Sequence, residues 1–125
     1  MTVSIKPLDE KALAHAVAEY RRIATEYLII DEWLDWARDE GNIHAMDEFS
    51  APHRFWENLG FWAETIYMRA KDMVTRAALG LPAVRFPWVH DSMHHIRNAE
   101  DERKALNYWK RGLRAAHTKT IPKRH

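Results

Sequence analysis

Apolar side chains recur at alternating spacings of four and three residues through two long stretches of the sequence. In the first stretch the repeat runs through Ala16, Tyr20, Ile23, Tyr27, Ile30, Leu34 and Ala37. At about 100° per residue these side chains share one side of an α-helix. Pro7 stands where a first helical residue belongs, and Gly41–Asn42 has the chemistry that ends a helix. The pattern predicts a first helix of about 30 residues.

The second stretch begins after a loop and shows the same periodicity. Ser50 and Pro52 are typical of a helix start, and the sequence LGLP at 79–82 is typical of a helix end. The predicted core stripe of this helix is Phe55, Leu59, Trp62, Ile66, Met73 and Ala77. Because the connection is short, the two long helices are predicted to lie antiparallel.

The apolar stripes in the last third of the chain are out of phase. One stripe is Val89, Met93 and Ile96, and the other is Leu106, Trp109, Leu113 and Ala116. On one regular helix they would lie about 130° apart. Asn98, with Asp101 three residues later, resembles a fresh N-cap. We therefore predict a short helix from Pro87, a break near Arg97–Asn98 and a helix from Ala99 to His117. Residues 1–125 are predicted to form a single all-α domain, an antiparallel bundle of about four helices.

The amino-acid composition excludes several kinds of catalytic and ligand-binding site. Without cysteine the chain forms no disulfide and offers no thiolate ligand or thiol nucleophile. It has no glycine-rich phosphate loop, and its three serines lack a nucleophile-elbow context. We expect no enzymatic activity and no cofactor. No leader-like or membrane-spanning apolar run occurs, so the expected location is cytoplasmic, without membrane contact.

Charge is divided sharply along the sequence. All 18 Asp and Glu residues precede residue 103, whereas 8 of the 19 Lys and Arg residues lie at 103–125. Such an asymmetry favours an acidic partner, most commonly a nucleic acid. On the last helix the cations fall opposite Trp109, and more follow in the tail. The predicted nucleic-acid-binding residues are Arg103, Lys104, Lys110, Arg111, Arg114, His117, Lys119, Lys123 and Arg124.

In size, all-helical build and basic face the whole chain resembles the small subunits of class 1 CRISPR effector complexes. Those subunits line up along a nucleic-acid backbone and hold guide RNA or target strand. The resemblance implies that Arg103, Lys104, Lys110, Arg111 and Arg114 face nucleic acid. The leading hypothesis is a non-catalytic subunit of a nucleoprotein complex that contacts RNA or DNA, beside other protein subunits or copies of itself.

Aromatic residues support a second hypothesis, a protein partner. Ile29, Trp33 and Trp36 lie opposite the core stripe of the first helix, and Phe61 and Met68 lie opposite that of the second. Tryptophan and phenylalanine are typical anchors of protein interfaces. These five residues are the predicted protein interface, as in a phage- or plasmid-type accessory or inhibitor protein that binds a host protein.

Histidine spacings support a third hypothesis, an enzyme or metal protein. The pairs His90/His94, His53/Glu57 and His44/Glu48 resemble the hemerythrin pattern of di-iron bundles. The pairs Arg38/His44, Arg85/His90 and Arg111/His117 match the R-x4–6-H motif of HEPN ribonucleases. However, His90 and His94 face away from the apolar stripe of their predicted helix and have no third ligand. We therefore predict no metal site, and keep a HEPN-like ribonuclease or a His/Glu metal-binding bundle as alternatives.

Overall fold

The computed structural model describes residues 8–86 and 95–121. These ranges form three α-helices and no strand: α1 (Glu10–Asp39), α2 (Ala51–Ala78) and α3 (Ala99–Thr118), with a 3-10 turn, η1 (Ile43–Ala45), between the first two. The predicted all-α class is confirmed. The predicted short helix from Pro87 lies mostly outside the described residues, and residues 95–98 are not helical, so the described chain has three α-helices where about four were predicted.

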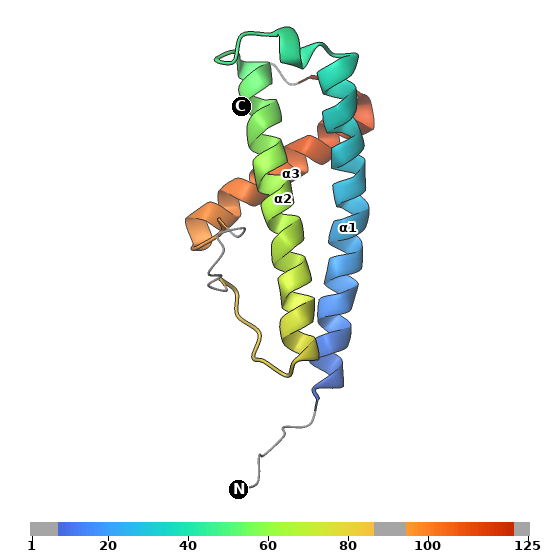
Figure 1. The fold of residues 1–125 in the computed structure, drawn as a ribbon, viewed down its shortest axis with the longest axis vertical. Coiled ribbons are helices and arrows are strands. Elements are labelled where there is room, and N and C mark those ends of the chain that lie inside the picture. Colours follow the sequence, from blue (N-terminus) through green and yellow to red (C-terminus); the bar gives the residue numbers. More distant parts are fainter. Residues whose placement is uncertain (1–7, 87–94, 122–125) are drawn as a thin grey trace, which may run out of the picture.

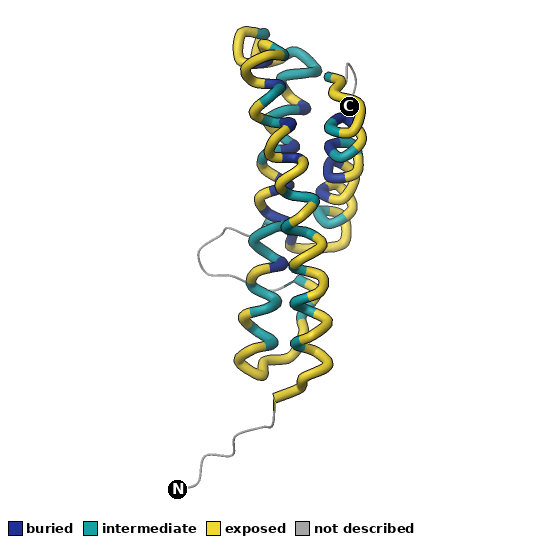
Figure 2. The backbone as a smooth tube through the Cα atoms, turned by 90° about the vertical axis from the view of Figure 1, so that its right-hand side faces the viewer, coloured by how far each residue is buried: buried dark blue, intermediate teal, exposed yellow. Residues whose placement is uncertain are grey.

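The two long helices form an antiparallel hairpin, and α3 covers only part of it. α1 and α2 run side by side along the long axis, while α3 crosses the upper half obliquely (Figure 1). The buried positions gather in the half that α3 covers (Figure 2). In α1 only Ile30, Trp33 and Ala37 are buried, whereas Ala16 and Ile23 of the predicted core stripe remain partly exposed.

Side-chain caps explain where the helices begin. The Asp9 carboxylate accepts a 3.0 Å hydrogen bond from the backbone N–H of Ala12, so α1 begins at Glu10 and not at Pro7 as predicted. Ser50 caps α2 in the same way, through the N–H of His53. Each cap satisfies a backbone donor that has no partner within its helix.

The start of α3 confirms the predicted break at Asn98. Asn98 Oδ1 accepts a 2.9 Å hydrogen bond from the N–H of Asp101, and the Asp101 carboxylate accepts one of 3.1 Å from the N–H of Arg97. The arrangement resembles a capping box, except that Asp101 accepts from the residue before the cap and not from Asn98 itself. It fixes the direction in which α3 leaves the connecting segment and therefore which of its faces meets the hairpin.

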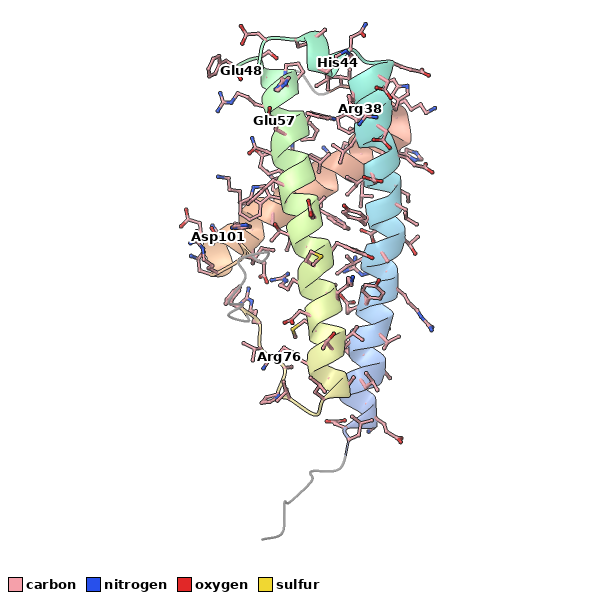
Figure 3. The ribbon with its side chains drawn as sticks, viewed as in Figure 1. Arg38, His44, Glu48, Glu57, Arg76 and Asp101 are labelled. Carbon is pink, nitrogen blue, oxygen red and sulfur yellow. The ribbon has the colours of Figure 1, made fainter. Side chains whose placement is uncertain are left out.

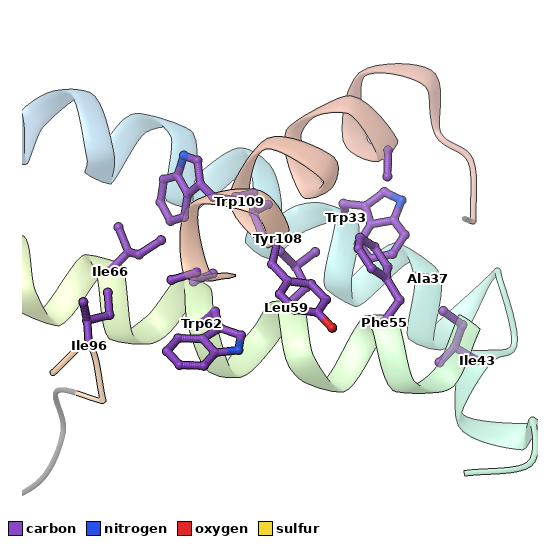
Figure 4. Close-up of a cluster of buried hydrophobic side chains, with 14 residues drawn as sticks. Trp33, Ala37, Ile43, Phe55, Leu59, Trp62, Ile66, Ile96, Tyr108 and Trp109 are labelled. Carbon is purple, nitrogen blue, oxygen red and sulfur yellow. The ribbon is translucent and has the colours of Figure 1, made fainter. Parts of the chain in front are cut away.

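The core forms where the three helices meet. Ile30 of α1 and Phe55 and Leu59 of α2 are fully buried, and Tyr108 and Trp109 of α3 pack against the same cluster (Figure 4). The tryptophan N–H groups are satisfied across helices, as buried polar groups require. Trp56 donates to the carbonyl oxygen of Leu34, Trp33 to that of Thr120, and Trp109 to the carboxylate of Glu26.

For two residues the predicted location, in the core or on the surface, is wrong. Trp33, predicted on an outward face of the first helix, is only 3% exposed, because the end of α3 and Thr120 cover that side. Leu106, predicted in the core of the last helix, is 39% exposed. It lies at the edge of the α3 stripe, while Trp109 is buried as predicted.

Candidate nucleic-acid interface

α3 presents a basic face to solvent because most of its apolar side packs against the hairpin. Ala105, Tyr108, Trp109 and Gly112 are buried. The predicted contact residues Arg103, Lys104, Lys110, Arg114, His117 and Lys119 are all exposed. We call Arg103, Lys104, Lys110 and Arg114 the α3 basic face. The segment from Arg103 to Arg114 extends about 16 Å along the helix, a length over which one strand of duplex DNA presents about five phosphates.

The α3 basic face is not neutralised by the chain's own acids. Among the described residues, none of its four cations lies within ion-pair distance of a carboxylate, and the same holds for Lys119. Several other arginines do have carboxylate partners: Arg22, Arg38, Arg69, Arg85 and Arg97. The positive charge of α3 is therefore available to an external anion.

Two of the three acids in the first turn of α3, Asp101 and Glu102, are engaged by other arginines. Glu102 pairs with Arg85 and with Arg69, whose Nη1 lies 3.0 Å from its carboxylate. The hydrogen bond from Arg85, followed by that from Arg69, holds the pKa of Glu102 below its ordinary value. The Asp101 carboxylate accepts the hydrogen bond from the N–H of Arg97 and lies 3.7 Å from Nε of the same residue. Glu100 borders the same surface hollow as Arg103, Lys104 and Lys110 but forms no ion pair with them, so the four cations outnumber the one acid on this side of α3.

Arg111 differs from the other predicted contact residues. Its guanidinium lies 4.6 Å from the ring centre of Phe55 and 5.7 Å from that of Tyr108, and the residue is partly buried. Such cation–π contacts tie α3 to the start of α2. The structure therefore places Arg111 beside the α3 basic face and not within it. Lys123 and Arg124 lie outside the described residues.

The predicted protein-interface residues are divided between two places. Ile29 is 44% exposed and borders a hollow of about 160 Å³ between α1 and the end of α3, together with Trp33, Trp36 and Lys119. Phe61 is 43% exposed on α2, where its ring lies 4.7 Å from that of His95, and Met68 is partly buried. The five residues therefore do not form one continuous surface.

The arginine–histidine pairs are occupied by structural contacts. Arg38 pairs with Asp35 and Asp39, and its carbonyl oxygen lies against His44 Nδ1. Arg38 and His44 lie on the α1 side of the upper end, whereas Glu48 and Glu57 lie on the α2 side (Figure 3). Arg85 pairs with Glu102, as described above.

Metal-ligand groups are not assembled in the described chain. His53 Nδ1 lies 3.2 Å from Glu57 Oε1, as their spacing on one helix allows. Across residues 8–86 and 95–121, however, no three His, Asp or Glu side chains lie close enough together to bind one ion. His90 and His94 fall outside these ranges.

A larger hollow lies in the angle between α1 and α3. It has a volume of about 450 Å³, with Ile23, Leu106, Trp109 and Leu113 among its apolar lining residues. Sequence reasoning missed it because it counted Leu106 as core. The sequence does indicate that Leu106 lies at the edge of the core, because its neighbours on the helix surface, Arg103 and Lys110, are both charged.

Comparison of the chain with protein-family models, with curated protein sequences and with solved structures found no match. No helix in the described ranges is long and apolar enough to span a membrane. The residues of the chain itself therefore carry the functional argument.

Proposed function

We propose that the protein binds the backbone of RNA or single-stranded DNA through the α3 basic face, without catalysis. The observation that carries this proposal is the grouping, on one side of α3, of four exposed cations without a carboxylate partner in the described chain. Other exposed cations without such a partner among the described residues, such as Arg21, Arg54 and Lys71, lie far apart along α1 and α2. Lysine and arginine that bind phosphates release condensed counterions, which favours association. Phosphate contacts fix position without reading sequence, so binding is expected to depend little on base identity.

The role we propose is that of a subunit in a larger nucleoprotein complex. α3 uses one side for the hairpin and leaves the other to solvent, so bound nucleic acid would lie along the outside of the bundle. A flat, one-sided contact of about 16 Å suits a protein that shares a strand with neighbours, as the small subunits of class 1 CRISPR effector complexes do.

A second candidate function is binding of a host protein by an accessory or inhibitor protein. It is favoured by the hollow of about 160 Å³ beside Ile29 and Trp36, which is large enough to accept an apolar side chain from a partner. Because Trp33 is buried, this surface has fewer aromatic anchors than predicted. The α3 basic face has no role in this alternative.

The test compares two variants of equal charge. The first carries Arg103→Ala, Lys110→Ala and Arg114→Ala. The matched control carries Arg21→Ala, Arg54→Ala and Lys71→Ala, three exposed cations of α1 and α2. With about 0.7 counterions released per contact, three lost contacts should weaken binding to a mixed-sequence single strand about 100-fold at 0.1 M salt. The control should bind nearly as tightly as the unmodified protein. Equal losses in both variants would refute a site on α3.

A further inference from the structure

The outer side of α1 carries an exposed apolar residue beside unpaired acids. Leu28 is 64% exposed, more than any other large apolar side chain within the described helices. Asp31 and Glu32, three and four residues later, share its side of the helix. Both are exposed, and neither has an ion pair within the described chain. We call these three residues the α1 acidic patch.

α3 carries the opposite arrangement. Leu106, 39% exposed, has Arg103 three residues before it and Lys110 four residues after it. These neighbours share its side of the helix and lack acidic partners in the described chain. Leu106 also borders the 450 Å³ hollow, which Trp109 and Leu113 help to line. Three carboxylates also line this hollow, and each is paired with an arginine: Glu19 and Glu26 with Arg22, and Glu102 with Arg69 and Arg85. Arg103 and Lys110 therefore remain as unpaired cations beside this recess, where the α1 acidic patch offers an apolar projection beside unpaired anions.

The two patches of one molecule cannot meet each other. α3 contacts the side of α1 that carries Glu26 and Trp33, as the hydrogen bonds of those two residues show. Leu28 is the most exposed large apolar side chain of α1 and lies on the opposite side of the helix from that contact. Glu32 borders the hollow at the end of α3 together with Lys119, but no ion pair joins the two. The complementary charges therefore remain available to a second molecule.

We propose that the partner of the α1 acidic patch is a second copy of this chain. Leu28 of one copy occupies the recess beside Leu106 of the other, and Asp31 and Glu32 lie against Arg103 and Lys110. Because the contact joins two different surfaces, it is heterologous and leaves one unused patch at each end of a pair. Further copies can add, so the assembly is open-ended and grows with concentration.

The proposed self-association does not depend on the proposed nucleic-acid binding, although both interactions use Arg103 and Lys110. A nucleic acid bound to the α3 basic face excludes the second copy. Free protein would then assemble at low salt, and a polyanion would dissolve the assembly. The two proposals can fail separately, because only self-association requires the α1 acidic patch.

Charge reversal tests the proposal by sedimentation velocity at about 20 mM salt, where attraction between exposed charges is least screened. One variant carries Asp31→Lys and Glu32→Lys; the other carries Arg103→Glu and Lys110→Glu. All four side chains are exposed, so circular dichroism should show an unchanged helical fold. Unmodified protein should gain mass with concentration. Each variant alone should remain at the monomer mass of 14.8 kDa, because its two patches carry the same sign.

A mixture of the two variants provides the decisive result. The basic face of the first variant fits the acidic patch of the second, and the new lysines of the first match the new glutamates of the second. The mixture should therefore regain the growth of mass with concentration that each variant alone has lost. A control with Glu40→Lys and Glu48→Lys, which makes the same change of charge at exposed sites away from both patches, should associate like the unmodified protein. A mixture that stays monomeric, unmodified protein that is monomeric at about 0.2 mM, or a control that loses association would each overturn the proposal.

Discussion

Replacing Gly112 by alanine adds a methyl group where α3 meets α2. A Cβ atom at this position would lie 2.6 Å from Leu59 Cδ1 and 2.8 Å from Leu59 Cδ2, well inside van der Waals contact. Leu59 is fully buried, so its side chain has no free space to move into. The two helices would have to separate, or Leu59 would have to leave its preferred rotamer.

Two opposing effects set the size of the change. Alanine in a helix interior is more stable than glycine by about 0.5–1 kcal/mol. Overpacking a buried site costs about 1–3 kcal/mol. We expect a net loss of about 1–2 kcal/mol, because Leu59 is enclosed. With an unfolding entropy of about 2.1 cal/mol/K per residue, this loss lowers Tm by about 4–8 °C.

Gly60 provides the matched control for a thermal melt followed by circular dichroism. It lies in the interior of α2, and the atom nearest to an added Cβ would be Leu34 Cδ1 at 3.9 Å, an ordinary contact. Gly60→Ala should therefore raise Tm by about 2–4 °C, from helix propensity alone. If Gly112→Ala also raised Tm, α3 would not cross α2 at Leu59, and the orientation of the α3 basic face would be wrong.

Three further predictions concern the anchoring of α3. Trp109→Ala should lower the unfolding free energy by about 3–5 kcal/mol in a urea titration, because it empties a buried site and removes a partner of Glu26. Asn98→Ala should cost about 0.5–2 kcal/mol in the same assay by removing the cap. Since the folded pKa of Glu102 is lowered, its stabilising contribution is complete above its ordinary pKa of 4.5 and is lost as pH falls through the folded pKa. Glu102→Gln should therefore lower Tm at pH 7 and weaken the fall of Tm with pH in this acidic range.

Local chemistry was enough to predict the helices. The apolar periodicity and the residues Ser50, Asn98 and Gly41 placed their boundaries within a few residues, because capping depends on neighbours along the chain. Asp9 capped α1 two residues beyond the predicted start at Pro7. Residues 87–94 lie outside the described ranges, so the short helix from Pro87 stays a prediction.

The path of α3 across the hairpin could not be predicted in this way. Trp33 is covered by the segment around Thr120, 87 residues later in the chain. The guanidinium of Arg111 lies over the ring of Phe55, which belongs to another helix. Leu106 is left at the margin because α3 crosses obliquely and does not follow the hairpin. Each error concerns a contact between distant residues, which helical periodicity does not specify.

The salt dependence of binding to a mixed-sequence single strand tests the central claim most directly. The four cations of the α3 basic face and Lys119 should give a log–log slope of about −3.5, and replacing Arg103, Lys110 and Arg114 by alanine should flatten it by about 2 units. The unmodified protein should show the full slope with strands of different sequence. A slope near zero, or a slope that the triple substitution leaves unchanged, would contradict a nucleic-acid interface on α3.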